Sequence, residues 1–189
     1  MKPRDEFKAR DILTATIREI EAVGLAGLSM EAVARRAEVA TGTVYIYFKN
    51  KDALISVLYA SIKDECADLL VTNEGLPVRV AFSRMCIALL EFVVANPGKV
   101  VFMAQVAHSP YLLPAGAKNG ADLGSKWMTA LLERGKQELL LKDLETSFML
   151  GFVLAVLRDL GPRLSSLPAA ERAARFELVA ALCWDALKA

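Results

Sequence analysis

The sequence is short of the residues from which catalytic and metal sites are usually built. It has one histidine and three cysteines in 189 residues, and no two of these four lie at the short spacing of a zinc site. No acid lies at a spacing that would join His108 and Ser109 in a hydrolytic triad, and no glycine-rich phosphate loop is present. We therefore predict no catalytic residues, no metal and no cofactor, and expect reduced, half-buried cysteines.

Excess charge and long hydrophobic runs are also missing. Lys and Arg number 23 against 22 Asp and Glu, for a net charge of +1, so any contact with DNA must be local. The longest apolar stretch, near Phe148 to Leu157, is shorter than a bilayer span, and the opening MKPRDEFKAR lacks the apolar run of a signal peptide. We expect a cytoplasmic protein that does not bind membranes.

Alanine and leucine are abundant, and they favour helices that pack on helices. Hydrophobic residues make up 54% of the chain and aromatic ones 7%, so the predicted fold class is all-α. Periodicity and breakers predict helices over residues 5–23, 29–37, 41–48, from 50 to a turn at 72–77, 78–95, 99–108, 125–139, 142–164 and 168–188. The proline- and glycine-rich residues 109–124 are expected to form a loop.

Several residues mark where these helices begin and end. Gly24 supplies a stop for the first helix, and the Ser29 hydroxyl can cap the second. Asn50 can cap the fourth helix, whose apolar stripe is Leu54, Val57, Leu58, Ile62 and Leu69. Asn96, Pro97 and Gly98 form a strong breaker between two later helices.

The three N-terminal helices have the pattern of a helix-turn-helix. Two short helices joined by a tight turn and held by a longer helix can place one helix in the major groove of DNA. In the second short helix, Val44 and Phe48 share a face that we assign to the core. Thr43, Ile46 and Tyr47 point elsewhere, and this face is rich in hydrogen-bonding groups.

The run LSMEAVARRAEVATGTVYIYFKNKDALISVLY closely resembles the signature of the TetR family of transcriptional regulators. Residue types and spacing match together over about fifty residues, from the capped helix to the Phe-x-x-Lys-x-x-Leu junction. The resemblance implies a helix-turn-helix DNA-binding domain over residues 1–50. It also implies a helical effector-binding and dimerisation domain over residues 51–189.

The resemblance places a set of residues against an operator in double-stranded DNA. Threonine and tyrosine hydroxyls can bond phosphates, the Thr43 methyl and Ile46 can touch a thymine methyl, and Lys51 can neutralise a phosphate. Gly42 would let the backbone come close. An alternative is that Tyr45 and Tyr47 pack against neighbouring helices. The whole set is Ser29, Thr41, Gly42, Thr43, Tyr45, Ile46, Tyr47 and Lys51.

Three positions depart from the family pattern. Glu38 stands where the turn usually has glycine, so a left-handed backbone there would cost about 1 kcal/mol. Ala40 replaces a capping serine whose loss costs about 1 kcal/mol, unless Thr41 caps one residue later. Glu31 lies where family members approach phosphate, and could instead stabilise the helix dipole.

In proteins of this family the C-terminal helices enclose a small molecule, whose binding moves the DNA-reading helices apart. Large, adaptable apolar side chains suit such a site, although most residues of this kind are ordinary core. His108 is the one possible side-chain cation among the candidates, so an apolar or aromatic effector is favoured. The candidates are Met85, Phe92, Phe102, Met103, His108, Tyr111, Trp127, Phe148, Met149 and Phe152.

The last two helices carry more apolar surface than a small body readily covers. A four-helix interface in a homodimer would bury it, although burial within one subunit is the alternative. Gly151 and Ala155 would allow close approach of the helices. The apolar residues concerned are Leu150, Leu154, Leu157, Val179, Leu182, Cys183 and Leu187.

Together these features predict a ligand-responsive regulator, not an enzyme. The expected activity is repression by binding a pseudo-palindromic operator, with release by a small hydrophobic molecule. The alternative is a helical small-molecule-binding protein or enzyme with a degenerate DNA-binding head. Because Thr43, Tyr47 and Lys51 are retained, the regulator is favoured.

Overall fold

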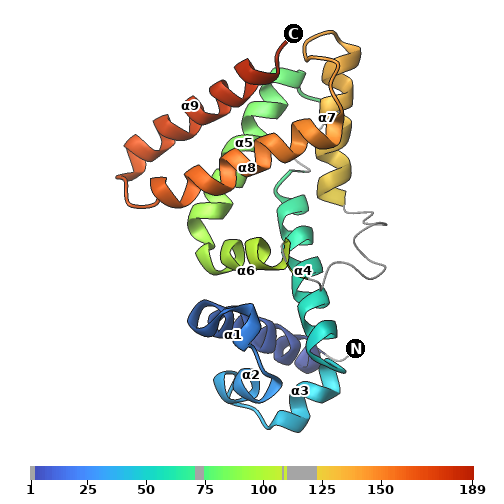
Figure 1. Cartoon of the computed structure of the whole chain (residues 1–189), viewed down its shortest axis with the longest axis vertical. Helices are drawn as coiled ribbons and strands as arrows, with labels where there is room; N and C mark the ends of the chain where they lie inside the picture. The colour runs from blue at the N-terminus through green and yellow to red at the C-terminus, as the bar shows by residue number, and fades with distance from the viewer. Residues whose placement is uncertain (1–2, 71–74, 108, 110–122) are drawn as a thin grey trace. The chain divides into compact units, whose positions relative to one another are not determined.

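The computed structural model describes residues 3–70, 75–107, 109 and 123–189, and most of these residues are helical, as predicted. They contain no strand, and one isolated antiparallel bridge joins Leu141 to Lys188. None of the helices in these ranges is long and apolar enough to cross a membrane. The helices are α1 (Pro3–Gly27), α2 (Met30–Arg36), α3 (Thr41–Tyr47), α4 (Lys51–Asp68), α5 (Val78–Ala95), α6 (Pro97–Ala107), α7 (Leu123–Gln137), α8 (Thr146–Leu164) and α9 (Ala169–Leu187) (Figure 1).

The chain divides into two compact units. The first, which we call the head, comprises Met1–Ile62 and Gly98–Gly120, and the second, the body, comprises Lys63–Pro97 and Ala121–Ala189. The head therefore extends beyond the predicted boundary at residue 50. It includes most of α4 as well as α6, which lies far from the first helices in the sequence.

In the head, α1 ends its regular course at Gly24, as predicted. The backbone there has φ 73° and ψ 169°, which is outside the helical range and suits glycine. One more turn follows, and its Leu25 amide donates to the Gln105 side-chain oxygen of α6 at 2.6 Å. Near the start of α6, a Cβ added to Gly98 would collide with Glu21 and with Ile17 of α1. Helix α6 is thus fitted closely against α1.

Two sequence-based expectations about the helices are wrong in detail. Val57 and Leu69, both assigned to the apolar stripe of the fourth helix, are 46% and 40% exposed. The breaker separates α5 from α6 as predicted, but α6 begins at Pro97, two residues before the predicted start at residue 99. Proline fits there because the first helical residues have no partner for their amide hydrogens.

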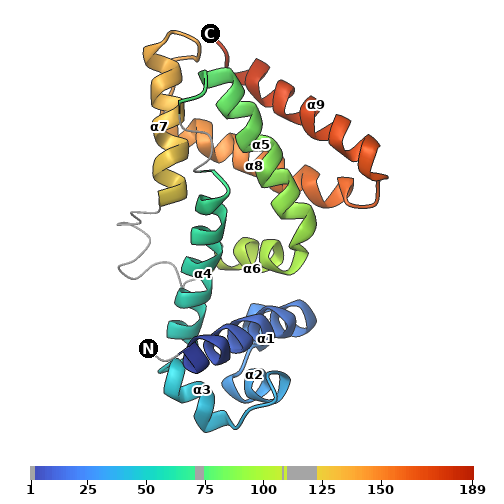
Figure 2. The same cartoon turned by 180° about the vertical axis from the view of Figure 1, so that it is seen from behind.

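The body is built around α5, which packs against α7, α8 and α9. Helix α8 crosses in front of α5 in Figure 1 and behind it in the reverse view of Figure 2. Gly161 of α8 permits this close crossing, because a Cβ there would collide with Val93 of α5. Phe82 and Trp184 meet edge to face in the core, with ring centroids 5.5 Å apart.

The cysteines are more buried than expected. Cys86 of α5 and Cys183 of α9 are both buried in the body core, and Cys66 is partly buried. Cys86 and Cys183 are free thiols. A hydrogen bond with the Cys183 thiol, together with burial, raises the pKa of Cys86 well above its usual range, so this thiol stays protonated at neutral pH.

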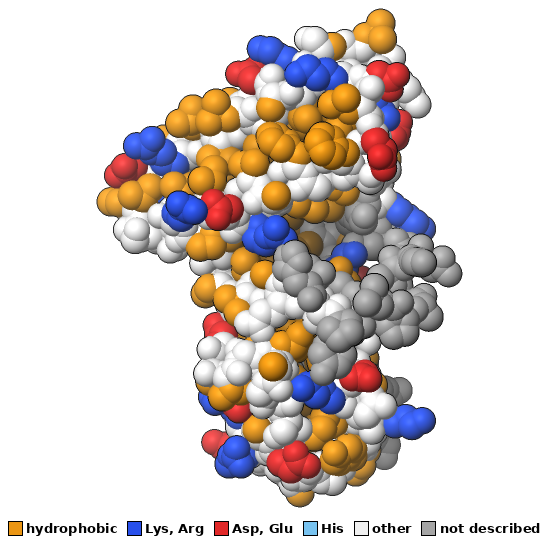
Figure 3. Space-filling view, in the orientation of Figure 1, with side chains coloured by type: hydrophobic (Ala, Val, Ile, Leu, Met, Phe, Trp, Pro, Cys, Tyr) orange, Lys and Arg blue, Asp and Glu red, His pale blue; other side chains and the backbone are white. Residues whose placement is uncertain are grey.

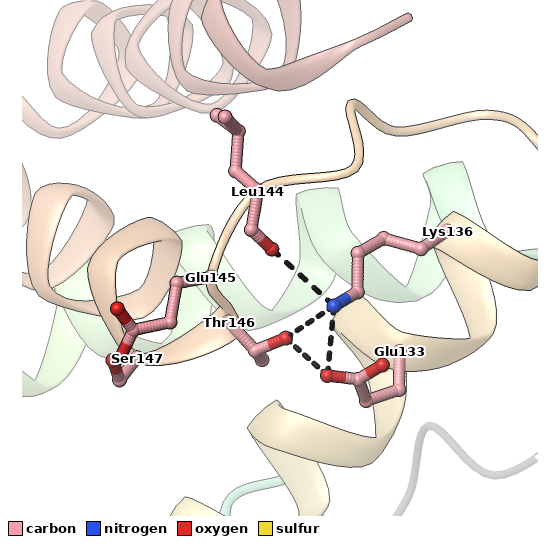
Figure 4. Close-up of polar contacts among 6 residues, drawn as sticks. All are labelled: Glu133, Lys136, Leu144, Glu145, Thr146 and Ser147. Atoms are coloured by element: carbon pink, nitrogen blue, oxygen red, sulfur yellow. Dashed lines mark hydrogen bonds and ion pairs between the residues drawn. The ribbon is translucent and has the colours of Figure 1, made fainter.

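A polar cluster joins the end of α7 to the start of α8 (Figure 4). The Lys136 ammonium lies 2.9 Å from Glu133, and it donates to the Thr146 hydroxyl at 2.8 Å and to the Leu144 carbonyl at 3.3 Å. The Thr146 hydroxyl in turn donates to Glu133. Hydrogen bonds from Thr146 and then Lys136 lower the pKa of Glu133. Because these groups bond to one another, we interpret the cluster as a structural clamp.

Candidate DNA-binding surface

Helix α2 begins with the predicted cap. The Ser29 hydroxyl accepts a hydrogen bond from the Ala32 amide at 3.1 Å, and Ser29 itself has an extended backbone. Met30 and Val33 are buried, so α2 is fixed by its apolar face. Ser29 therefore has a structural role in holding the start of α2, whatever it contacts in addition.

The turn after α2 adopts the left-handed conformation that the sequence suggested. Glu38 has φ 56°, its amide donates to the Arg35 carbonyl at 3.3 Å, and the Val39 amide donates to the Ala34 carbonyl at 3.0 Å. This pair of bonds is the Schellman arrangement that commonly ends a helix. The turn keeps its usual hydrogen bonds although a glutamate occupies the position that favours glycine.

Helix α3 begins without a side-chain cap. Ala40 is the N-cap residue and Thr41 is already helical, so Thr41 does not take over capping one residue later. The Thr43 amide instead donates to the Ala40 carbonyl at 2.8 Å. At its other end, α3 is anchored by Val44 and Phe48, which are buried as predicted.

The opposite side of α3 faces solvent. Ile46 is 79% exposed and Tyr45 47% exposed, and Gly42 has open space where a Cβ would stand. Thr41, Thr43 and Tyr47 are partly buried. Tyr47 lies beside the Phe48 ring, with centroids 6.5 Å apart, which gives partial support to the packing alternative for Tyr47.

The start of α4 lies directly after this surface. The Asn50 side chain accepts from the Ala53 amide at 2.8 Å and so caps α4, as predicted. Lys51, the first residue of α4, is partly buried. The eight residues predicted to face DNA thus come from the cap of α2, from the first residue of α4 and from every part of α3 except its buried side.

Sequence reasoning missed two long-range contacts that hold this surface in place. Arg36 of α2 lies 2.5 Å from Glu19, a buried residue of α1, so Arg36 holds two helices together. The bond from Leu25 to Gln105 similarly joins α1 to α6. Neither pair has a local sequence signal, because the partners lie 17 and 80 residues apart.

The predicted effector residues do not share one environment. Met85, Phe92 and Met149 are buried in the body and Trp127 is partly buried there, whereas Phe102 and Met103 belong to α6 of the head. Phe148 and Phe152 lie on the exposed side of α8. His108 and Tyr111 lie outside the described residues. Among the residues that are described, no cluster of three or more His, Cys, Asp or Glu is arranged to hold a metal.

The predicted dimer residues also need correction. Leu157, Val179, Cys183 and Leu187 are buried in the core of one body, which is the alternative that the sequence left open, and Leu150 and Leu154 pack partly against it. Of that set, Leu182 is clearly exposed, at 58%. The apolar side chains that do face outward from α8 and α9 are Phe148, Phe152, Leu178 and Leu182.

A short capped helix, a Schellman turn and a second short helix with a solvent-facing outer side define a helix-turn-helix protein with a separate helical body. Residues 12–58 match the family described as "Bacterial regulatory proteins, tetR family". The head of this chain is therefore similar to the DNA-binding domain of TetR-family transcriptional regulators.

Individual curated proteins are similar to part of this chain. An uncharacterized HTH-type transcriptional regulator of Mycobacterium tuberculosis is 31% identical over 87 residues, which span 46% of this chain and 41% of the relative. One from Haemophilus influenzae is 51% identical over 47 residues, 25% of each chain. The chain therefore matches less than half the length of these curated relatives.

Solved structures extend the likeness in fold to the whole chain. A TetR family transcription regulator from Marinobacter aquaeolei has a TM-score of 0.88 at 23% identity, covering 100% of this chain and 99% of that one. The regulator FadR from Bacillus subtilis, solved in complex with stearoyl-CoA, has a TM-score of 0.70 at 14% identity, covering 92% and 96%. The all-helical fold of head and body is thus shared with proteins of this family.

Proposed function

We propose that this protein is a dimeric, ligand-responsive repressor that binds a pseudo-palindromic operator with α3 in the major groove. The observation that carries the proposal is the outer side of α3. Val44 and Phe48 anchor the helix from one side, while Gly42, Tyr45 and Ile46 face solvent on the other. A buried anchor behind an exposed helix face is the arrangement that a helix inserted in the groove requires.

The proposed homodimer forms through α8 and α9. Phe148, Phe152, Leu178 and Leu182 are between 39% and 66% exposed. Figure 3 shows hydrophobic side chains gathered over these two helices on one face of the body. A contiguous apolar surface of this kind is typical of a protein interface. A two-fold axis there would present two heads to two half-sites of DNA, which explains a pseudo-palindromic operator.

The proposed effector is a small hydrophobic molecule. Met85 and Met149 in the body core have flexible, adaptable side chains, and the similarly folded FadR was solved with stearoyl-CoA, which carries a long acyl chain. As a regulator of bacterial genes, the protein would act in the cytoplasm, where the DNA lies. Its relatives are named as regulators, which supports a role other than that of an enzyme.

Selection of bound duplexes from a random library tests the proposal directly. We expect the protein to enrich two inverted half-sites, and gel shifts to give much tighter binding than random DNA. Lys51→Ala should weaken binding to every duplex alike and flatten the salt dependence by about one unit per lost phosphate contact. Ser56→Ala on the exposed side of α4 is the control and should change neither. Failure to enrich any sequence, with or without effector, would favour the degenerate-head alternative.

The dimer and the effector need separate tests. Phe152→Glu or Leu182→Glu should give monomers by light scattering, whereas Leu139→Glu, at an 82% exposed leucine outside this face, should leave the dimer intact. A panel of long-chain acyl-CoA and aromatic compounds should contain a ligand that lowers operator affinity. Operator DNA should then lower the affinity for that ligand by the same factor. Dimers in all three variants would contradict the interface.

A further inference from the structure

Ile46 is the most outward-pointing side chain of α3. Successive residues of an α-helix are turned by about 100°, so Gly42 and Ile46, two residues on either side of buried Val44, both point away from it. Thr43 and Tyr45 flank this line. The exposures agree, since Val44 is fully buried and Ile46 is 79% exposed.

An aliphatic side chain at this position has no structural explanation within the head. Ile46 is far more exposed than Val44 or Phe48, which provide the packing of α3. A β-branched side chain in a helix also keeps essentially one rotamer. The methyl groups of Ile46 therefore face solvent in a nearly fixed position on α3.

The outer side of α3 also lacks the side chains that read most bases. Its sequence, TGTVYIY, contains no Arg or Lys to pair with guanine, no Asn or Gln to pair with adenine, and no Asp or Glu to accept from cytosine. Its remaining means of direct readout are hydroxyl hydrogen bonds and apolar contact. In the major groove, the apolar group that distinguishes thymine from the other bases is its C5-methyl.

Gly42 allows such a contact to be close. It lies one turn before Ile46 on the same side, and a Cβ there would meet no atom of the head within 4 Å. Neither packing nor a left-handed backbone therefore requires glycine at this position. The missing side chain lets the first turn of α3 approach a partner outside the protein.

From these observations we propose that α3 selects its half-site by thymine methyl groups, with Ile46 as the specificity-determining residue that contacts them. This inference rests on the proposed function. It identifies the operator as a sequence with an A·T pair, thymine methyl toward α3, at the base step facing Ile46 in each half-site.

The experiment replaces each thymine of the selected half-site, one position at a time in both half-sites, by deoxyuridine. This change removes the C5-methyl and keeps every hydrogen-bonding group of the base pair. At the position facing Ile46 we expect about fourfold weaker binding per half-site, since a buried methyl contributes about as much as a buried methylene. For the symmetric pair of replacements the expected loss is therefore roughly fifteenfold.

Two variants assign the effect to a residue. Ile46→Ala should bind the thymine and deoxyuridine duplexes equally, while Val23→Ala, at a 50% exposed valine of α1, should keep the wild-type ratio. Both substitutions are at exposed positions, and thermal unfolding checks that the head remains folded.

Each contrary outcome has its own meaning. If no sequence is enriched in the selection, the proposed function fails and this inference fails with it. If a sequence is enriched but no deoxyuridine replacement weakens binding, or the operator has no thymine in its half-sites, thymine readout is wrong while the regulator stands. If a replacement weakens wild type and Ile46→Ala equally, another residue reads the methyl group and the role of Ile46 is refuted.

Discussion

Gly42→Ala should make the protein more stable and a worse DNA-binding protein. Glycine inside a helix costs about 0.5–1 kcal/mol relative to alanine, and the added methyl group would meet no atom of the head within 4 Å. For a chain of 189 residues this gain in the free energy of unfolding corresponds to a Tm increase of roughly 1–4 °C.

The same methyl group would lie between the α3 backbone and the DNA. Forcing an extra methylene into a well-packed contact typically costs 1–3 kcal/mol, which is a loss of operator affinity of roughly fivefold to 150-fold. Calorimetry gives the first quantity, and a gel-shift titration at fixed salt gives the second.

Ala60→Gly is a suitable control because Ala60 is an exposed residue within α4. It should lower the free energy of unfolding by a similar amount and leave operator affinity unchanged. If Gly42→Ala retains wild-type affinity, the backbone of α3 does not approach DNA, and the reasoning for both Gly42 and its neighbour Ile46 is refuted.

Three further predictions concern stability. Glu38→Gly should raise the free energy of unfolding by about 1 kcal/mol, because Glu38 has φ 56°; urea denaturation would contradict this if the variant were less stable. Gln105→Ala should lower the free energy of unfolding by about 1–3 kcal/mol, because it leaves the Leu25 amide without its acceptor. Gln137→Ala, at an exposed position, should have little effect. Equal losses of stability in the two variants would reject the role of this hydrogen bond. The pKa of Glu133 is lowered by its bonds to Thr146 and Lys136. The stability that ionised Glu133 contributes to the fold is therefore present above its unfolded pKa of about 4.5 and is lost as pH falls through the folded value. Glu133→Gln should lower Tm at neutral pH, and the difference in Tm from wild type should shrink in acid.

The sequence predicted well the features that depend on neighbouring residues. The Ser29 and Asn50 caps, the stop at Gly24 and the bounds of α5 all follow from local chemistry, and the structure confirms them. A cap or a helix stop involves residues within a few positions of one another, so the pattern is visible in the sequence.

The sequence could not show which of two apolar faces is buried. Helix α8 carries Met149, Val153 and Leu157 on one side and Phe148 and Phe152 on another. Both sets have helical spacing, and only packing against α5 distinguishes them. For this reason Phe148 and Phe152 were expected near a ligand and Leu157 at a dimer interface, whereas the structure places the phenylalanines outside and the leucine in the core.

The inclusion of α6 in the head has a practical consequence for protein engineering. A fragment that ends at Ile62 would lose the Gln105 acceptor of the Leu25 amide and the buried side chains of Phe102 and Val106. The helix-turn-helix therefore cannot be transferred to another protein as the first fifty residues alone. A chimera that grafts the helix-turn-helix onto the body of a relative would recover a stable head only if it also carried the residues of α6 that match α1, above all Gly98 and Gln105.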